Sequence, residues 1–237
     1  MNPALFDLVH QDGALLIANK PAGLLAVPGR GADKQDCLSA RVQFEFPDAL
    51  VVHRLDMATS GLIVFARGLE MQRRLSRMFQ QREVTKRYAA VVVGRMEPAK
   101  IQSFPSLTIL QMERERSLLL PPGEGWEGGW GEVNLPIVAD WPNRPLRKID
   151  VKHGRPSLTR YQVLSRNADT TRVELEPVTG RTHQLRVHMA AIGHPILGDA
   201  LYGNAASAPR LLLHACTLSF AHPLSGELLN FMSESPF

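Results

Sequence analysis

The chain has 237 residues, 44% of them hydrophobic and 21% charged, and carries a formal net charge of +4. It is long enough for a core of ordinary size, and no apolar run reaches the roughly 18 residues of a membrane span. The N-terminus lacks a secretory pattern, and the two cysteines, Cys37 and Cys216, are far apart, which argues against a disulfide framework. We therefore expect a soluble, monomeric, cytoplasmic protein without membrane association.

Positive charge is concentrated in two stretches of the sequence. Residues 67–87 contain seven basic and two acidic residues, and residues 143–160 contain six basic residues and one acidic residue. Clustered positive charge on a mildly basic protein is typical of proteins that bind polyanions. Either cluster alone is equally compatible with a solvated helix face, but the two together favour nucleic acid as the partner.

The first hundred residues contain short apolar strands and two helices, separated by glycine and proline. The predicted elements are strands at 14–19, 62–66 and 88–93, a helix within 34–46, and a second helix over 70–82. In the second helix, Met71, Leu75 and Met78 recur at helical spacing, and arginines occupy the opposite face.

The remainder of the chain begins with an irregular stretch, residues 96–133, whose glycine and proline content predicts a loop. After it we expect a β-hairpin formed by 160–165 and 171–176, a helix within 181–195, and strands at 210–220 and 227–231. Strands dominate and no βαβ alternation is sustained. This pattern predicts an α+β fold with a mixed, mostly antiparallel sheet and flanking helices.

The stretch "HRLDMATSG", residues 53–61, places charged residues between two apolar runs. Burying an ionised carboxylate costs several kcal/mol unless another group pairs with it. Asp56 therefore has either a structural role, in which it caps a turn with Thr59 or Ser60, or a catalytic role on a loop fixed by the scaffold. The spacing alone leaves both readings open.

Two other kinds of site are weaker candidates. "HRLD" is similar to the kinase catalytic loop, but the chain has no DFG motif and no glycine-rich nucleotide loop, so a kinase is excluded. A zinc helix requires histidines four residues apart with a nearby acid, whereas His183 and His188 are five apart. We interpret the histidines as hydrogen-bonded structural residues and expect no metal site.

Arg181 lies at the start of the predicted helix, where it shares a face with Gln184 and His188. A cation at a helix N-terminus opposes the helix dipole. Either a carboxylate partner compensates for this cost, or the arginine is exposed and tolerates it. The sequence pattern does not decide between these two possibilities.

Five motifs in order connect these features: "NKPAGLLAVPG", "HRLDMATSGLIVFA", "KRYAAVV", "GRTHQLRVHMAAIGHPILGD" and "RLLLHA". Together they resemble the RluA family of pseudouridine synthases over nearly the whole chain. With "DWPNRP", they are most similar to the RluA branch that modifies ribosomal and transfer RNA. The resemblance implies an isomerase of the pseudouridine synthase fold, acting on uridines in structured RNA without metal or cofactor.

The resemblance also assigns roles to individual residues. It makes Asp56 the catalytic aspartate, Tyr88 the tyrosine that stacks on the target base, and Arg181 the arginine that pairs with the aspartate. Arg54 matches the arginine that enters the RNA where the uridine leaves. From the basic clusters we add a set of expected RNA contacts: Arg73, Arg74, Arg77, Lys86 and Arg144.

The chain departs from the family pattern in two places. "NKPAG" begins at residue 19, so we expect one catalytic domain over 1–237 without an N-terminal S4-type RNA-binding domain. Residues 100–131 are longer than the equivalent connection and are predicted to be a loop insertion. Its tryptophans, Trp126 and Trp130, either stack on RNA or hold the loop in place, and we favour the second role.

Two functions remain as alternatives. One is a catalytically silent RNA-binding protein of the same fold, although the retained Asp56, Tyr88 and Arg181 favour an active enzyme. The other is a metal-dependent hydrolase that uses the histidines.

Overall fold

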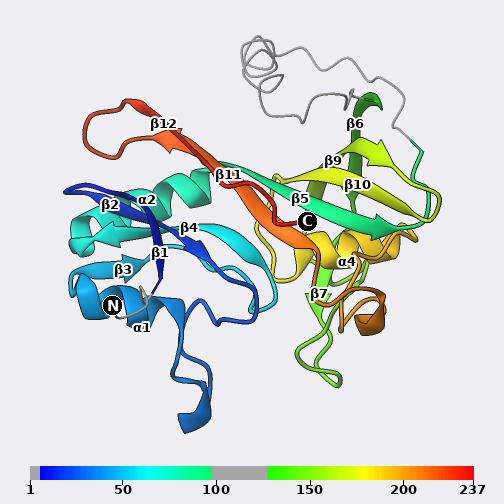
Figure 1. Ribbon diagram of the computed structural model, residues 1–237, viewed down its shortest axis with the longest axis horizontal. Helices are drawn as coiled ribbons and strands as arrows, with labels where there is room; N and C mark the ends of the chain where they lie inside the picture. The colour runs from blue at the N-terminus through cyan, green and yellow to red at the C-terminus, as the bar shows by residue number, and fades with distance from the viewer. Residues whose placement is uncertain (1–5, 98–126) are drawn as a thin grey trace.

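The computed structural model describes residues 6–97 and 127–237, and its main feature is one ten-stranded sheet (Figure 1). Its strands are β1 (Asp7–Gln11), β2 (Leu15–Lys20), β3 (Ala49–Val51), β4 (Ser60–Arg67), β5 (Thr85–Val93), β6 (Glu127–Asn134), β9 (Leu158–Arg166), β10 (Thr170–Pro177), β11 (Leu213–Ala221) and β12 (Leu228–Met232). They run in the order β1-β2-β4-β11-β5-β10-β9-β6, with β3 paired to β4 and β12 to β11. All of these pairings are antiparallel except β4 with β11, which confirms the expected mixed, mostly antiparallel sheet.

In the described part of the chain, the remaining elements are three α-helices, two short 3-10 helices and one separate hairpin. They are α1 (Leu38–Glu45), α2 (Gly68–Gln81), α4 (Gln184–Ala191), the 3-10 helices Ala32–Lys34 and Ala205–Ser207, and the hairpin of β7 (Ile137–Ala139) with β8 (Arg147–Ile149). Within the described ranges, no helix is long and apolar enough to cross a membrane.

The helices cover the two faces of the sheet unequally. Side chains alternate along a strand, so Leu16 of β2 packs in the cluster that contains α1, and its neighbour Leu15 packs in the cluster that contains α2. Tyr88 of β5 contacts both the α1 cluster and the cluster that contains α4. α1 and α4 therefore lie on the same face of the sheet, and α2 lies on the other.

Most predicted elements are confirmed, but strands β1, β3, β7 and β8 were not predicted and several boundaries are wrong. Residues 127–133, predicted as part of a loop, belong to strand β6, which pairs with β9. The glycines suggested a loop, yet a Cβ at Gly131 would lie 2.3 Å from the ring of Tyr161, so glycine allows these strands to meet. The last predicted helix begins only at Gln184, so Arg181 precedes it. The rest of the predicted insertion, including Trp126, lies outside the described residues.

Gly61 fixes the end of the loop between β3 and β4. It has φ +113°, and a Cβ there would lie 2.3 Å from the carbonyl oxygen of Ala215 on β11. Only glycine adopts this backbone and permits the close approach of β4 to β11. The loop that carries Asp56 therefore enters the sheet at a fixed point.

Candidate active site

The β3–β4 loop is held by hydrogen bonds from its neighbours. The Thr59 N–H donates to the Asp56 carbonyl at 3.1 Å, and the Val64 N–H of β4 donates to Nε2 of His53 at 3.1 Å. The His53 ring stacks on Phe79 of α2, with ring centroids 4.6 Å apart. Burial, with a smaller contribution from the Lys86 charge, lowers the pKa of His53 to about 3, so its ring stays neutral and can accept this bond.

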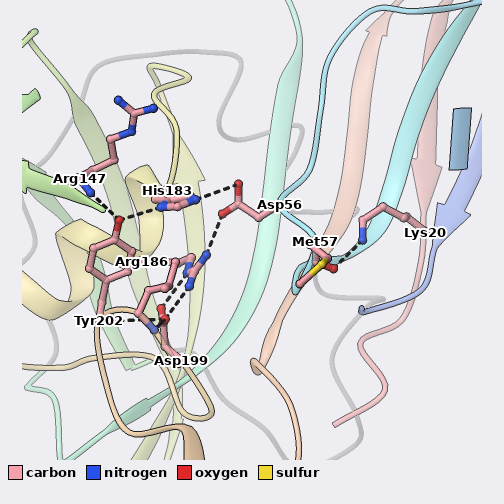
Figure 2. Close-up of polar contacts among 9 residues, drawn as sticks. Lys20, Asp56, Met57, Arg147, His183, Arg186, Asp199 and Tyr202 are labelled. Carbon is pink, nitrogen blue, oxygen red and sulfur yellow. Dashed lines mark hydrogen bonds and ion pairs between the residues drawn. The ribbon is translucent and has the colours of Figure 1, made fainter. Parts of the chain in front are cut away.

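Lys20 holds the same loop from β2. Its side chain is buried, and Nζ donates to the carbonyls of Pro21 at 2.8 Å, Leu24 at 2.7 Å and Met57 at 3.0 Å (Figure 2). Burial lowers the pKa of Lys20 to about 8, and the negative charge of Asp56 opposes this shift. The ammonium group thus ties the residue after Asp56 to the sheet.

Asp56 makes an ion pair with Arg186 of α4. The Arg186 Nη1 donates to Asp56 Oδ2 at 3.2 Å, and its Nε and Nη2 donate to the two oxygens of Asp199 at 2.8 and 2.6 Å. The side chain of Asp199 is fully buried, whereas that of Asp56 is 26% exposed. Burial favours a neutral Asp199, but the hydrogen bonds from Arg186 outweigh it and lower the pKa of Asp199. One guanidinium therefore serves two carboxylates, and only Asp56 is accessible.

The predicted pairing of Asp56 with Arg181 is wrong. The Arg181 side chain donates to the Pro156 carbonyl at 3.3 and 3.4 Å, and its backbone N–H donates to Gln184 Oε1 at 3.0 Å. Arg181 precedes the first residue of α4, and its side chain is directed at Pro156 and not at Asp56. The apolar neighbours Leu185 and Val187 are the only local hint that Arg186 is buried, and they do not identify its partner, because adjacent side chains of a helix face different directions.

A histidine lies beside the second oxygen of Asp56. His183 Nε2 is 3.9 Å from Asp56 Oδ1, and His183 Nδ1 is 2.7 Å from the Tyr202 hydroxyl. The sequence pattern predicts only a structural role for His183 and gives no indication of Asp199 or Tyr202. Among the described residues, no group of three or more His, Cys, Asp and Glu side chains is placed to hold a metal ion.

Tyr88 lies next to this site on β5. Its ring is partly buried between the α1 and α4 clusters. Burial raises the pKa of the Tyr88 phenol, and the negative charge of Asp56 raises it further. The hydroxyl therefore stays protonated at neutral pH, and the ring lies close enough to Asp56 to respond to its charge.

The predicted RNA-binding residues are spread over the surface. Arg54 is exposed, two residues before Asp56. Arg73 and Arg77 of α2 are exposed and line a shallow groove of about 350 Å³. We call it the α2 groove and define it by its five lining residues: Gln72, Arg73, Ser76, Arg77 and Gln80. Because Gln72 also donates to the Val51 carbonyl at 2.8 Å, the groove runs beside the strand that leads into the Asp56 loop.

The other three predicted contacts interact with the protein itself. Arg74 donates to Glu70 at 2.6 Å, Lys86 lies 5.7 Å from the centre of the Phe79 ring, and Arg144 stacks on the exposed Trp141 at 3.5 Å. Burial lowers the pKa of Lys86. Trp130 of β6 packs against the guanidinium of Arg87 at 5.6 Å, in agreement with a structural role for this tryptophan.

Comparison with known proteins identifies the family. Residues 14–191 match the family described as RNA pseudouridylate synthase. The chain belongs to this family. It is 43% identical to the dual-specificity RNA pseudouridine synthase RluA of Escherichia coli strain K12, over 97% of this chain and 93% of that protein. It is 46% identical to the enzyme of the same name from Vibrio cholerae, over 92% of this chain and 78% of that protein.

A solved structure shows the same fold. The human RNA pseudouridylate synthase domain containing 1 covers 100% of this chain with a TM-score of 0.70 at 26% sequence identity, and 87% of its own chain is matched. The family explains why no motif for a nucleotide or redox cofactor is found in the sequence, since the reaction rearranges bonds within one nucleotide.

Proposed function

We propose that this protein converts uridines to pseudouridines in structured RNA, in ribosomal RNA, transfer RNA or both, with Asp56 as its catalytic carboxylate. The observation that carries the proposal is the position of Asp56. It is partly exposed between the halves of the sheet covered by α1 and α4, and one of its oxygens is paired with a buried guanidinium. The family and the bacterial relatives support the same reaction.

The reaction requires a carboxylate but little else. The bond between uracil N1 and ribose C1′ breaks, the uracil turns, and a bond forms between C5 and C1′. The proton on C5 is then lost and N1 gains one, so atoms and charge balance without an oxidant. An ionised Asp56 can act as a nucleophile or as a base in these steps. Arg186 holds this carboxylate in place, with its Nη1 donating to Asp56 Oδ2 at 3.2 Å.

Binding of the uridine requires that it leave its stack in the RNA. This costs a few kcal/mol, and aromatic stacking together with phosphate contacts offsets it. We assign the stacking to Tyr88, whose ring packs between the α1 and α4 clusters and whose hydroxyl remains protonated. We assign Arg54 to the space that the uridine vacates, because it is exposed on the same loop. Arg73, Arg77 and Arg144 are exposed candidates for phosphate contacts, and Arg74 is also exposed but is paired with Glu70.

We further propose that residues 1–237 act as one catalytic domain and as a monomer in the cytoplasm. The continuous sheet, which joins the two halves around Asp56, supports a single domain. Two free cysteines are compatible with a reducing compartment. Size-exclusion chromatography with and without RNA would test the monomer.

The proposed function is tested with purified protein and RNA transcripts, with pseudouridine detected by mass spectrometry. Asp56→Asn should lower the single-turnover rate by about 10³-fold or more, because an amide is neither a nucleophile nor a base. Its affinity for RNA should stay within about threefold. Asp36→Asn removes an exposed carboxylate outside the site and should behave like wild type. An Asp56→Asn rate within tenfold of wild type would exclude Asp56 as the catalytic group.

A further inference from the structure

His183 has an unusual backbone conformation. Among the described residues, only Arg82 and His183 have a positive φ without being glycine. Arg82 ends α2, where a left-handed residue is common. His183 precedes α4 with φ 57° and ψ 16°, although residues in this position usually have extended backbone. Such strain persists when surrounding contacts require it.

The contacts of His183 explain this conformation. Its Nδ1 is 2.7 Å from the Tyr202 hydroxyl, and the same hydroxyl accepts the backbone N–H of Arg147 on β8 at 2.8 Å. Its Nε2 faces Asp56 Oδ1 at 3.9 Å. Figure 2 shows the imidazole between Tyr202 and Asp56, with Arg186 approaching the other carboxylate oxygen.

This arrangement selects one tautomer of the imidazole. The Tyr202 oxygen already accepts a hydrogen bond from the Arg147 backbone N–H, so its own O–H needs an acceptor. His183 Nδ1 is that acceptor only if it carries no hydrogen. The hydrogen of the neutral ring is then on Nε2, which faces Asp56.

We propose that His183 is a positioning residue that directs its Nε2–H at Asp56 Oδ1 and so fixes the plane of the catalytic carboxylate, with Tyr202 selecting the tautomer. This inference rests on the proposed function. With Arg186 alone on Oδ2, the carboxylate can turn about its Cβ–Cγ bond. A second donor at Oδ1 removes that freedom, and a closure of about 1 Å would convert the contact into a hydrogen bond.

The charges around His183 give the proposal a pH dependence. Burial favours the neutral ring, Arg186 and Arg147 oppose a proton, and Asp56 and Asp199 favour one. The net effect lowers the pKa of His183, so the ring is neutral at pH 7. Below that pKa an imidazolium pairs closely with Asp56, and the Tyr202 O–H loses its acceptor. The close positive charge makes the carboxylate a weaker nucleophile and a weaker base, so activity should fall on the acid side as His183 gains its proton.

Two variants test the role. His183→Asn keeps a residue type that tolerates the left-handed backbone but is too short to reach from Tyr202 to Asp56. We expect its single-turnover rate to fall about 10- to 100-fold, with RNA affinity within threefold. Tyr202→Phe keeps His183 but removes the O–H that favours the neutral ring. Its acid-side midpoint should therefore move to higher pH, by half a unit or more.

The controls separate this inference from the proposed function. His194→Asn changes a half-buried histidine outside the site, whose Nδ1 lies 2.9 Å from the Val93 carbonyl oxygen, and it should match wild type. If His183→Asn keeps the wild-type rate, or if the Tyr202→Phe and wild-type pH profiles coincide, His183 does not position Asp56. The Tyr202→Phe profile decides the question if His183→Asn fails to fold. Failure of wild type to form any pseudouridine would instead overturn the proposed function.

Discussion

The charged groups of the Asp56 site are paired with other side chains of the protein, whereas Arg73 and Arg77 of the α2 groove face solvent. Asp56 receives contacts from α4 and lies near Lys20 of β2, so groups far apart in sequence converge on one carboxylate. In the α2 groove, Arg73 and Arg77 come from one helix and face solvent. Their positions follow from helical spacing alone, whereas those of the Asp56 partners depend on the whole sheet.

This difference determines what a single substitution can reveal. Removing one member of a buried ion pair leaves the charge of its partner uncompensated, so both the free energy of unfolding and the activity should fall strongly. Removing one exposed arginine leaves nothing uncompensated, so the cost appears only when RNA is bound. The predictions below use this contrast.

The largest effect on stability should follow Arg186→Met. It leaves the buried Asp199 and the adjacent Asp56 without a cation, which typically costs about 3–5 kcal/mol. The rate of pseudouridine formation should fall about 100-fold or more. Arg181→Met is the matched control, because that side chain makes only long bonds to a carbonyl. Urea unfolding should place Arg181→Met within about 1 kcal/mol of wild type. Equal losses of unfolding free energy in Arg186→Met and Arg181→Met would show that Arg186 is not the buried partner of the two carboxylates.

A smaller effect should appear in acid through His53, which joins the two regions by stacking on Phe79 of α2. Its pKa is about 3 in the folded protein, against an ordinary value of 6.5 for histidine. Between these values only the unfolded chain takes up the proton, so stability falls as pH decreases. At pH 5 the loss relative to neutral pH is about 2 kcal/mol.

The variant His53→Gln tests this, because its amide oxygen can accept the Val64 N–H without titrating. Unfolding free energies at pH 7 and pH 5 should therefore differ by about 2 kcal/mol less in His53→Gln than in wild type. Other buried histidines contribute equally to both proteins. An identical pH dependence would mean that His53 takes up its proton in the folded state.

The smallest effect should follow neutralisation of the α2 groove. Arg73→Gln with Arg77→Gln should leave unfolding unchanged and lower RNA affinity, with the salt dependence flattened by about 0.7–0.9 per lost phosphate contact. Arg74→Gln is the control, because Arg74 already pairs with Glu70. If neither the Arg73/Arg77 double variant nor the Arg74 variant changes the salt dependence of RNA affinity, the α2 groove is only a solvated helix face.

The sequence predicted the fold better than the contacts of the site. Apolar runs such as Leu62–Ala66 report burial directly, and helix α2 follows from its own periodicity. The family resemblance placed Asp56 and Tyr88 in one site. It could not show which arginine of "GRTHQLR" meets Asp56, because that depends on where the helix begins. His183 and Tyr202 come together only through the fold, and no local pattern joins them.

A double-mutant cycle on the free energy of unfolding tests the pairing of Asp56 with Arg186. Asp56→Asn and Arg186→Met should be non-additive by about 1 kcal/mol or more, because removing the carboxylate relieves part of the uncompensated charge. Asp56→Asn and Arg181→Met should add within about 0.5 kcal/mol. Additive effects with Arg186, or coupling with Arg181 in its place, would show that Asp56 does not pair with Arg186.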